Sequence, residues 1–487
     1  MKIGFDNDKY IRIQSEHIKE RIAKFSGKLY LELGGKLFDD HHASRVLPGF
    51  QPDSKLRMFH KLSDHIEIVI VISAEDIEKN KVRADLGITY DEDVLRLRDE
   101  FIKRGFYVGS VVLTHYSGQH SADAFRQRLT RLGIKSYVHY LIDGYPHNVD
   151  LIASDEGFGK NDYVETERPL VIVTAPGPGS GKMAVCLSQL YNEHKRGVEA
   201  GYAKFETFPV WNLPLKHPVN IAYEAATADL NDVNMIDPFH LEAYNKIAIN
   251  YNRDIEIFPV LNALFEGIYG SNPYKSPTDM GVNMVGFCIS DDEVCCQASK
   301  DEIIRRYYAA TNKFANGADN ESEVQKIQML FNQAKITTAT RKVTTVAKQR
   351  RDETGTPCAA IELADGTMIT SKSTDLLGPS AALLLNATKY LAGIDHNVRL
   401  IPQNMIEPIQ KTKIDYLGGN NPRLHTDEVL VALSVLSQAD ENCRKALAQL
   451  PALRGCQVHS TVMLSEVDHK IFKKLGIGLT CDPVKKK

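Results

Sequence analysis

The sequence predicts an α/β protein in three parts. These are a doubly wound, mostly parallel sheet domain over residues 1–235, a mainly helical segment over 236–351, and a smaller α/β domain over 352–487. In the first part, short continuous apolar runs alternate with helical patterns, as in parallel sheets that are covered on both faces. Strand-like runs become rare in the second part. A hairpin signal and further strand-like runs mark the third.

Five apolar runs predict the strands of the first domain: Lys28–Leu33, Ile66–Ser73, Tyr107–Leu113, Ser136–Ile142 and Leu170–Thr174. After the third run, Ser121 is the expected cap of a helix whose apolar face carries Phe125, Leu129 and Leu132. A further strand-like run covers Val149–Ala153. The repeated order of strand, helix and strand favours a doubly wound sheet.

The rest of the chain yields fewer but distinct signals. Lys300–Leu330 is rich in helix formers, and Arg350–Gly355 has the composition of a linker or an exposed turn. Beyond it, two strand-like runs flank Asp365-Gly366, a strong hairpin signal. The remaining predicted elements are a helix and two strands: Ser380–Ala392, Val398–Pro402 and Val458–Leu464.

Composition excludes several classes of protein. The 487 residues are 43% hydrophobic, and 59 basic against 62 acidic residues give a net charge of −3. We therefore expect no nucleic-acid partner. We also expect no membrane partner, because the longest apolar runs are much shorter than the roughly 20 residues of a membrane helix. Eight cysteines are too few for a disulfide scaffold, and we expect a cytoplasmic protein.

The most informative stretch lies after the strand-like run Leu170–Thr174. A glycine-rich loop follows directly, with Gly177, Gly179, Ser180 and Gly181, and Lys182 then opens a helical pattern. Glycines let several backbone N–H groups face one anion, and a helix N-terminus adds a favourable field. Lys182 is placed to reach the outer phosphates of a ligand. The alternative is a tight turn that needs glycine only for its backbone geometry.

The loop departs from the standard phosphate-binding motif G-x-x-x-x-G-K-[ST] at two positions. Pro176 stands where the first glycine is expected, and Met183 stands where a hydroxyl would bind Mg²⁺. A thioether is a poor ligand for Mg²⁺, which prefers hard oxygen. Ser180 or a carboxylate from elsewhere, such as Asp229, Asp232 or Asp237, would have to replace it. The sequence thus leaves the metal ligands and the Mg²⁺ requirement open.

Loops after two other predicted strands add candidate site residues. Gly34, Gly35 and Lys36 follow the first strand, where open α/β sheets place their ligands. In the same loop, Asp40, His42 and Arg45 are candidates for a base, an acid and an anion clamp, although paired histidines on a loop are as often merely solvated. His115 and His120 follow the third strand and are expected at the same edge of the sheet.

Two acidic features lie near the glycine-rich loop in the sequence. In the segment 154–160, Asp155 or Glu156 is expected to hold a metal or act as a base in a second wall of the same site; an exposed charged turn is the alternative. Lys204 and Glu206 alternate, so on a strand they share one face.

Signatures of hydrolases are absent. The chain has no H-E-x-x-H metal motif and no G-x-S-x-G nucleophile motif. A hydrolase or peptidase that uses Cys or His therefore depends on scattered residues such as Cys295, Cys358, Cys456 and Cys481, and a buried, inert thiol is the commoner situation.

Four stretches together resemble signature segments of an uncharacterised bacterial family of about this length: residues 154–163, 175–183, 204–209 and 276–281. The resemblance covers essentially the whole chain. It implies a bacterial, cytoplasmic protein, and some members carry a label as ATP-dependent peptidases. It transfers no catalytic residues. It also implies that Met183 is a feature of the family.

The sequence therefore favours an enzyme that binds a small phosphorylated ligand, ATP or another nucleotide first among them. Phosphoryl transfer, nucleotidyl transfer or ligation is the expected reaction class. A non-catalytic nucleotide sensor and the Cys/His hydrolase or peptidase remain as alternatives. The second substrate is not indicated, and whether the chain forms a homo-oligomer is open.

Overall fold

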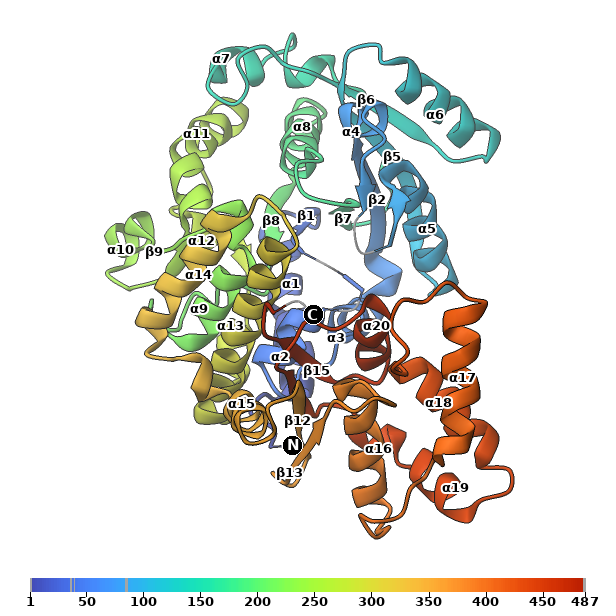
Figure 1. The fold of residues 1–487 in the computed structure, drawn as a ribbon. Helices are drawn as coiled ribbons and strands as arrows, with labels where there is room; N and C mark the ends of the chain where they lie inside the picture. Colours follow the sequence, from blue (N-terminus) through green and yellow to red (C-terminus); the bar gives the residue numbers. More distant parts are fainter. Residues whose placement is uncertain (1, 36, 39, 84–85, 485–487) are drawn as a thin grey trace. The chain divides into compact units, whose positions relative to one another are not determined.

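The computed structural model describes residues 2–35, 37–38, 40–83 and 86–484 (Figure 1). The chain forms two compact units. The N-terminal unit comprises Ile3–Tyr223 and Asp232–Cys295, and the C-terminal unit comprises Glu224–Asn231 and the chain from Cys296 onward. Each has its own sheet and its own apolar core.

A seven-stranded parallel sheet forms the centre of the N-terminal unit, in the order β11-β8-β1-β7-β2-β5-β6. The strands are β1 (Leu29–Leu33), β2 (Ile66–Ser73), β5 (Tyr107–Tyr116), β6 (Ser136–Tyr140), β7 (Leu170–Thr174), β8 (Gly201–Phe205) and β11 (Gly281–Val282). Every residue of β1, β2 and β7 is buried, which explains why these strands are mostly apolar. Glu32 in β1 and Glu67 in β2 are the charged exceptions. The five predicted strands are confirmed.

The order of the strands creates two places where the chain leaves neighbouring strands in opposite directions. From β7 the chain continues to β8, whereas from the adjacent β2 it continues to β5 on the other side. The same holds for the neighbours β8 and β1: the next strand of this sheet after β8 is β11 on one side, and the next after β1 is β2 on the other side. In open α/β sheets such switch points open a crevice at the carboxyl ends of the strands, where ligands bind.

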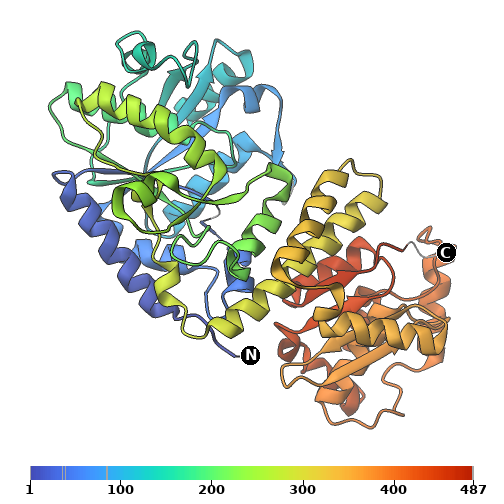
Figure 2. The same cartoon turned by 90° about the vertical axis from the view of Figure 1, so that its left-hand side faces the viewer.

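Helices cover both faces of this sheet. On one face, α8 (Lys182–Lys195) and α11 (Asn252–Tyr269) pack on Tyr30, Tyr202 and the valines of β7. On the other face, Phe205 contacts Phe59 of α3 (Ser54–His60). The long helix α1 (Asn7–Lys24) contacts β8 and β11 (Figure 2).

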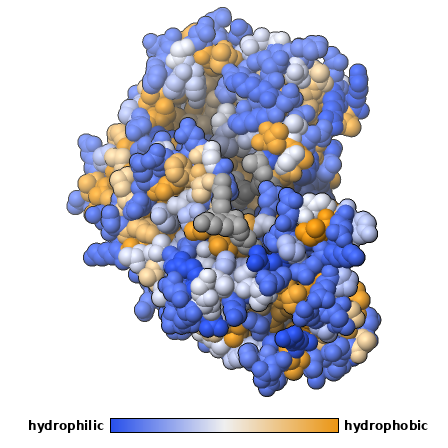
Figure 3. All heavy atoms as spheres, viewed as in Figure 1, coloured by the Kyte–Doolittle hydropathy of each residue, from blue (hydrophilic) through white to orange (hydrophobic). Residues whose placement is uncertain are grey.

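The remaining elements of the N-terminal unit are short, apart from α5 and α6. The helices are α2 (His41–Val46), α4 (Ala74–Glu78), α5 (Tyr90–Lys103), α6 (His120–Arg131), α7 (Val149–Ile152), α10 (Pro238–Tyr244) and α12 (Pro277–Met280). A boundary of the two units falls within α9 (Pro218–Ala226), after Tyr223. Two small antiparallel pairs complete it: β3 (Val82–Arg83) with β4 (Ile88–Thr89), and β9 (Asn234–Ile236) with β10 (Ile249–Tyr251). Apolar side chains gather on the surface over β9 and α10, at the left of Figure 3, including Met235 and Leu241.

The C-terminal unit has a four-stranded mixed sheet in the order β13-β12-β14-β15. Its strands are β12 (Cys358–Glu362), β13 (Met368–Lys372), β14 (Gln457–Ser460) and β15 (Gly478–Cys481). The Asp365-Gly366 hairpin joins β12 and β13 antiparallel, as the sequence predicts. The helices are α13 (Asp292–Ala315), within which the boundary of the two units falls, α14 (Glu321–Ala334), α15 (Lys342–Thr354), α16 (Pro379–Leu391), α17 (Gln403–Asp415), α18 (Thr426–Leu436), α19 (Glu441–Leu447) and α20 (Glu466–Lys474).

A buried carboxylate joins the N-termini of three of these helices. Asp468 is fully buried and accepts hydrogen bonds from Ser380 at the start of α16, from the backbone N–H of Thr426 at the start of α18, and from Ser465, which caps α20. His425 Nδ1 lies 3.1 Å from Asp468 Oδ2. Burial opposes ionisation, but these partners hold the pKa of Asp468 well below its usual range. Asp468 is therefore a structural anion.

The α/β fold class is confirmed, while four local predictions are wrong. Val149–Ala153 is not a strand, because the helix α7 forms there. The Asn148 side chain caps α7 by accepting a hydrogen bond from the backbone N–H of Leu151. Arg350–Gly355 is not a linker, because α15 continues to Thr354 and ends at Gly355. No strand forms over Val398–Pro402. The N-cap of α6 is Gln119 rather than Ser121.

The division at residues 235 and 351 stays a prediction. The described part of 236–351 is mainly helical, from α10 to α15. None of the helices in the described ranges has the length and apolar character needed to cross a bilayer.

Candidate functional site

Loops from four parallel strands meet the solvent at one edge of the N-terminal sheet. β1 ends just before Gly34, β5 leads to His120, β7 leads into the glycine-rich loop, and β8 ends just before Glu206. Because the strands are parallel, all four loops leave from their carboxyl ends. The structure thus brings together most of the predicted loops.

The glycine-rich loop is held by bonds within the unit. Gly179 and Gly181 have positive φ of 75° and 81°, which reverse the chain between β7 and α8. Ser180 is buried, and its hydroxyl donates to the carbonyl of Gly177 over 2.7 Å. Thr114 of β5 donates its hydroxyl to the carbonyl of Ser180, also over 2.7 Å. The loop is therefore fixed in one shape before any ligand arrives.

Two glycines of this loop have no room for a side chain. A Cβ on Gly177 would collide with the hydroxyl end of Tyr90, and a Cβ on Gly181 would lie 3.1 Å from Thr114 Oγ1. Gly179 has open space around it. Packing therefore requires glycine at position 177, the backbone angle requires it at 179, and both the angle and a tight contact favour it at 181.

Lys182 is the first residue of α8, and no side chain caps this helix. Among the described residues, no acidic side chain pairs with Lys182, which is half-buried. The first N–H groups of a helix need partners from outside the helix, and the helix dipole favours an anion there. Met183 packs against the apolar core, so it offers no oxygen to a metal.

The two predicted histidines are placed differently. His115, at the end of β5, has its Nδ1 3.1 Å from the hydroxyl of the buried Ser73, the last residue of β2. It thereby bridges the two strands beside the glycine-rich loop. His120 begins α6 with an exposed side chain.

In the loop after β1, Asp40 caps α2 and forms a 2.9 Å ion pair with Lys55, which is 1% exposed. Burial alone would raise the pKa of Asp40, but Lys55 lowers it below its ordinary value. The ring of His42 packs against Phe208 with centroids 5.1 Å apart. Arg45, in α2, is half-buried. Lys36, predicted to bind the ligand, lies outside the described residues.

The segment 154–160 does not form a second wall of the glycine-rich loop. Asp155 accepts a hydrogen bond from Tyr191 and pairs with Lys195, both in the last turns of α8. At 1.5 Å per helical residue, these partners lie roughly 14–20 Å from Lys182. Glu156 is exposed. Asp155 and Glu156 thus lie on an exposed charged turn, the alternative interpretation of the sequence, whereas Phe158 of the same segment packs in the core.

Most of an ionic cluster at the end of β8, which is largely shielded from solvent, is not visible in the sequence. Lys204 Nζ lies 2.8 and 2.7 Å from the two carboxylate oxygens of Asp254, and 2.9 Å from Glu206 Oε1. The hydroxyl of Tyr251 donates to Glu206. Lys204 and Glu206 do share one face, as predicted, whereas Asp254 comes from α11 and Tyr251 from β10.

The four groups perturb one another strongly. Burial raises the pKa of Glu206 to about 7; Lys204 opposes this effect and Asp254 adds to it. Burial would lower the pKa of Lys204, but Asp254 and Glu206 raise it well above its ordinary value. Lys204 is therefore a permanent cation, and Glu206 is a carboxyl whose pKa lies near neutral pH.

A small cavity of about 40 Å³ opens beside this cluster. Residues from the end of β8, from β10, α11 and α12 line it, and its wall includes the only tryptophan of the chain, Trp211. The lining consists of Lys204, Glu206, Pro209, Trp211, Ile249, Asn250, Asp254, Pro277, Thr278, Gly281 and Asn283.

The cavity and the glycine-rich loop lie two strand spacings apart. Glu32 of β1 pairs with Val173 of β7 on one side and with Lys204 of β8 on the other. Adjacent strands are about 4.8 Å apart, so the ends of β7 and β8 are separated by about 10 Å. Gly34, between them, leaves room for Glu206, because a Cβ there would come within 2.8 Å of Glu206 Cγ.

Two further candidates for a predicted metal or catalytic role have structural tasks. Asp237 caps α10 and accepts from Thr278, and Asp232 pairs with Arg253. The thiols of Cys295, Cys358, Cys456 and Cys481 are all buried. Burial also raises the pKa of Cys456. Neutral, inaccessible thiols are poor nucleophiles, which argues against the hydrolase alternative at these positions.

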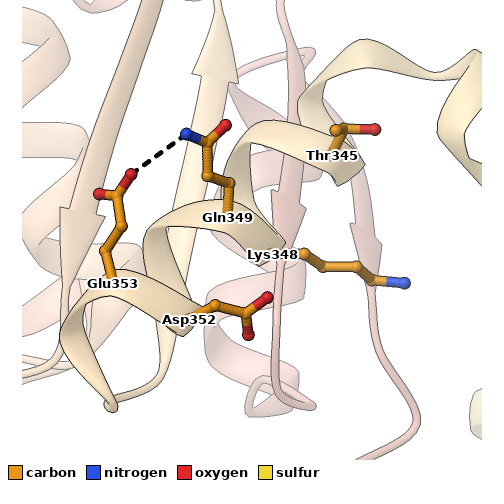
Figure 4. Close-up of a pocket in the computed structure, with 5 residues that line it drawn as sticks. All are labelled: Thr345, Lys348, Gln349, Asp352 and Glu353. Atoms are coloured by element: carbon orange, nitrogen blue, oxygen red, sulfur yellow. Dashed lines mark hydrogen bonds between the residues drawn. The ribbon is translucent and has the colours of Figure 1, made fainter.

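A wider hollow of about 550 Å³ lies on α15 in the C-terminal unit (Figure 4). Thr345, Lys348, Gln349, Asp352 and Glu353 line it, and all five come from one helix. Gln349 donates to Glu353 across one turn, over 3.2 Å. Because no other element directs a side chain into it, this hollow is a solvated helix face rather than a binding site.

Comparison with known proteins identifies the family. The model of the N-terminal domain of unknown function DUF1846 matches residues 3–335, and the model of its C-terminal domain matches 339–487. The chain belongs to the DUF1846 family. The resemblance predicted from the sequence is thus confirmed.

The relatives of this DUF1846 protein are bacterial and similar over their full length. It is 58% identical to the UPF0371 protein cu0538 of Corynebacterium urealyticum, over 99% of this chain and 97% of that protein. It is 55% identical to a UPF0371 protein of Streptococcus sanguinis and 54% identical to the UPF0371 protein stu1377 of Streptococcus thermophilus, in each case over 99% of this chain and 98% of the relative.

Proposed function

We propose that the N-terminal unit is a nucleotide-binding enzyme domain that holds the phosphates of its ligand at residues 177–182. The observation that carries the proposal is the loop itself: a fixed glycine-rich turn at a switch point of the sheet, followed by a helix whose N-terminus has no side-chain cap. An anionic group placed there would gain hydrogen bonds from backbone N–H groups and an ion pair with Lys182.

The proposed reaction class is phosphoryl or nucleotidyl transfer, or ligation through an activated phosphate. The carboxyl edge supports it because a second set of polar side chains, around Glu206, lies about 10 Å from the loop across β1. That distance suits an enzyme that brings a second substrate to a phosphorylated one. A sensor would need only the first set.

Binding of ATP and of inorganic pyrophosphate, measured by isothermal titration calorimetry with and without Mg²⁺, tests the proposal. Lys182→Ala removes one charge-assisted contact worth about 1.5–3 kcal/mol, so the affinity should fall roughly 10- to 100-fold. Lys195→Ala, at the opposite end of the same helix, is the matched control and should bind like the wild type. Equal affinities of the Lys182→Ala variant and the wild type for both ligands would refute the proposal.

A further inference from the structure

The cluster at the end of β8 has one more carboxylate than its cation can balance. Lys204 is matched by Asp254, which it contacts through both carboxylate oxygens. Glu206 shares the same ammonium and a hydroxyl from Tyr251. A purely structural ion pair would need only the first two residues. The second carboxylate stands at the wall of the cavity, where it meets whatever enters.

The charges around the cavity exclude two kinds of occupant. A metal ion is excluded because the Lys204 ammonium already lies within 3 Å of both carboxylates, where a cation would have to bind. A carboxylate or phosphate is excluded because it would meet Glu206 and Asp254 in a buried site that holds one lysine. A neutral group that donates and accepts hydrogen bonds meets neither objection.

The size and the walls of the cavity narrow the class of ligand further. A cavity needs roughly 10–15 Å³ to hold one water molecule, and this one offers about 40 Å³, enough for a few atoms of a ligand. The cavity therefore has room for one small arm of a ligand rather than for a whole nucleotide. Trp211, Pro209 and Pro277 offer apolar walls, while Glu206, Asn250 and Thr278 offer polar ones. A hydroxymethyl group, which has an apolar carbon and a polar oxygen, matches both kinds of wall.

We infer that this cavity binds a hydroxyl-bearing arm of a neutral polyol or sugar-like ligand, and that Glu206 exchanges a proton with that hydroxyl. When the ligand is deprotonated, its O–H bond breaks, the electron pair stays on its oxygen, and the proton forms the O–H bond of Glu206. That this ligand is the second substrate of a transfer reaction rests on the proposed function; its binding in the cavity does not.

The protonation behaviour of Glu206 supports this role. Burial raises its pKa to about 7, so both protonation states are populated at neutral pH, as proton exchange requires. The titratable groups that face Glu206 come from four elements: Lys204 of β8, Tyr251 of β10, Asp254 of α11 and Tyr223 of α9. Lys204 stays charged, and burial raises the pKa of each tyrosine far above neutrality. The pKa of Glu206 thus lies where its charge changes near pH 7.

Trp211 gives a direct readout, because its emission arises at the cavity alone. We expect the Trp211 fluorescence of the full-length wild type to change with pH, with a midpoint near pH 7. Glycerol is the probe ligand. It should shift that midpoint and change the emission up to a saturating value. Glu206→Gln should abolish the titration and weaken the glycerol response by about tenfold, the loss of one hydrogen bond to a charged group. Glu256→Gln, on the exposed side of α11, should behave like the wild type.

Circular dichroism checks the fold of each variant. Glu206→Asp is a second test variant, because it keeps a titrating carboxyl but withdraws it from the cavity by one methylene. The pH titration of the emission should therefore stay, and the glycerol response should fall. The inference is overturned if the wild-type emission does not titrate, if Glu206→Gln keeps the wild-type glycerol response, or if acetate perturbs the emission as strongly as glycerol. Lys182→Ala separates the two proposals, because it should lose nucleotide affinity and keep the glycerol response.

Discussion

Glu206→Gln should change how the stability of the N-terminal unit depends on pH. The carboxyl pKa of Glu206 is raised from 4.5 to about 7 in the folded protein. Because its folded pKa lies above its unfolded one, Glu206 contributes most stability below pH 4.5, and this contribution is lost as the pH rises through 7. One pKa unit corresponds to about 1.4 kcal/mol, so the loss amounts to about 3 kcal/mol.

Glutamine does not titrate, so the variant escapes this loss. The difference in the free energy of unfolding, variant minus wild type, should increase by about 3 kcal/mol between pH 4.5 and pH 8. Whatever hydrogen bonding the substitution alters adds a constant and leaves this slope intact. Other titrating groups cancel because both proteins contain them.

Urea unfolding at a series of pH values, followed by the fluorescence of Trp211, measures this difference for the N-terminal unit. Glu256→Gln serves as the control and should give a difference that does not vary with pH. A flat difference for Glu206→Gln, or one that decreases toward pH 8, would show that Glu206 is not a buried carboxyl of raised pKa.

Three further predictions concern other positions. Gly177→Ala should destabilise the N-terminal unit by about 1–3 kcal/mol in thermal unfolding, because its methyl group meets Tyr90. Gly179→Ala has open space around it and should cost only about 1–2 kcal/mol for its backbone angle, yet it should still weaken nucleotide binding. A Gly179→Ala variant less stable than Gly177→Ala would contradict the packing. Asp468→Asn should destabilise the C-terminal unit by about 3 kcal/mol at pH 7. Since the folded pKa of Asp468 lies below its ordinary value, the wild type should lose this advantage in stability as the pH falls through the acid range. If the variant is less stable by the same amount at every pH, the ionised carboxylate is not the source of the stability. Cys296, the half-buried cysteine, should react first with a thiol reagent under native conditions, as mass spectrometry of the labelled protein would show. Faster labelling of any of the seven buried cysteines would contradict the burial pattern.

The fold class could be predicted because it depends on local signals. Runs such as Ile66–Ser73 are almost wholly apolar, with Glu67 as the one charged residue, and that composition is typical of a strand covered on both faces. The errors arose where the signal was short or polar. Val149–Ala153 fits a strand or a helix equally well, and the Asn148 cap decided for a helix. Arg350–Gly355 is polar because that end of α15 is largely solvated, and polarity alone does not separate a solvated helix from a linker.

The candidate site could be predicted only in its local part. The glycine-rich loop is contiguous, so its residues are visible in the sequence. The partners of Glu206 are not: Asp254 lies 50 residues after Lys204 and reaches it through the packing of α11 on the sheet. Likewise, no sequence pattern indicates that β7 lies between β1 and β2. The alternation of Lys204 with Glu206 was the one available signal.

The position of β1 in the sheet also matters while the chain is being synthesised. Its two neighbours are β7 and β8, and Leu29 pairs with Leu170 and Gly201. At about 5–20 residues per second, the ribosome takes roughly 7–30 seconds to reach Leu170 after Leu29. During that time β1, apolar except for Glu32, has no partner strand and is exposed to other nascent chains. A chaperone that binds early on the nascent chain is therefore expected to contact the segment around β1, and to leave once β7 and β8 have emerged.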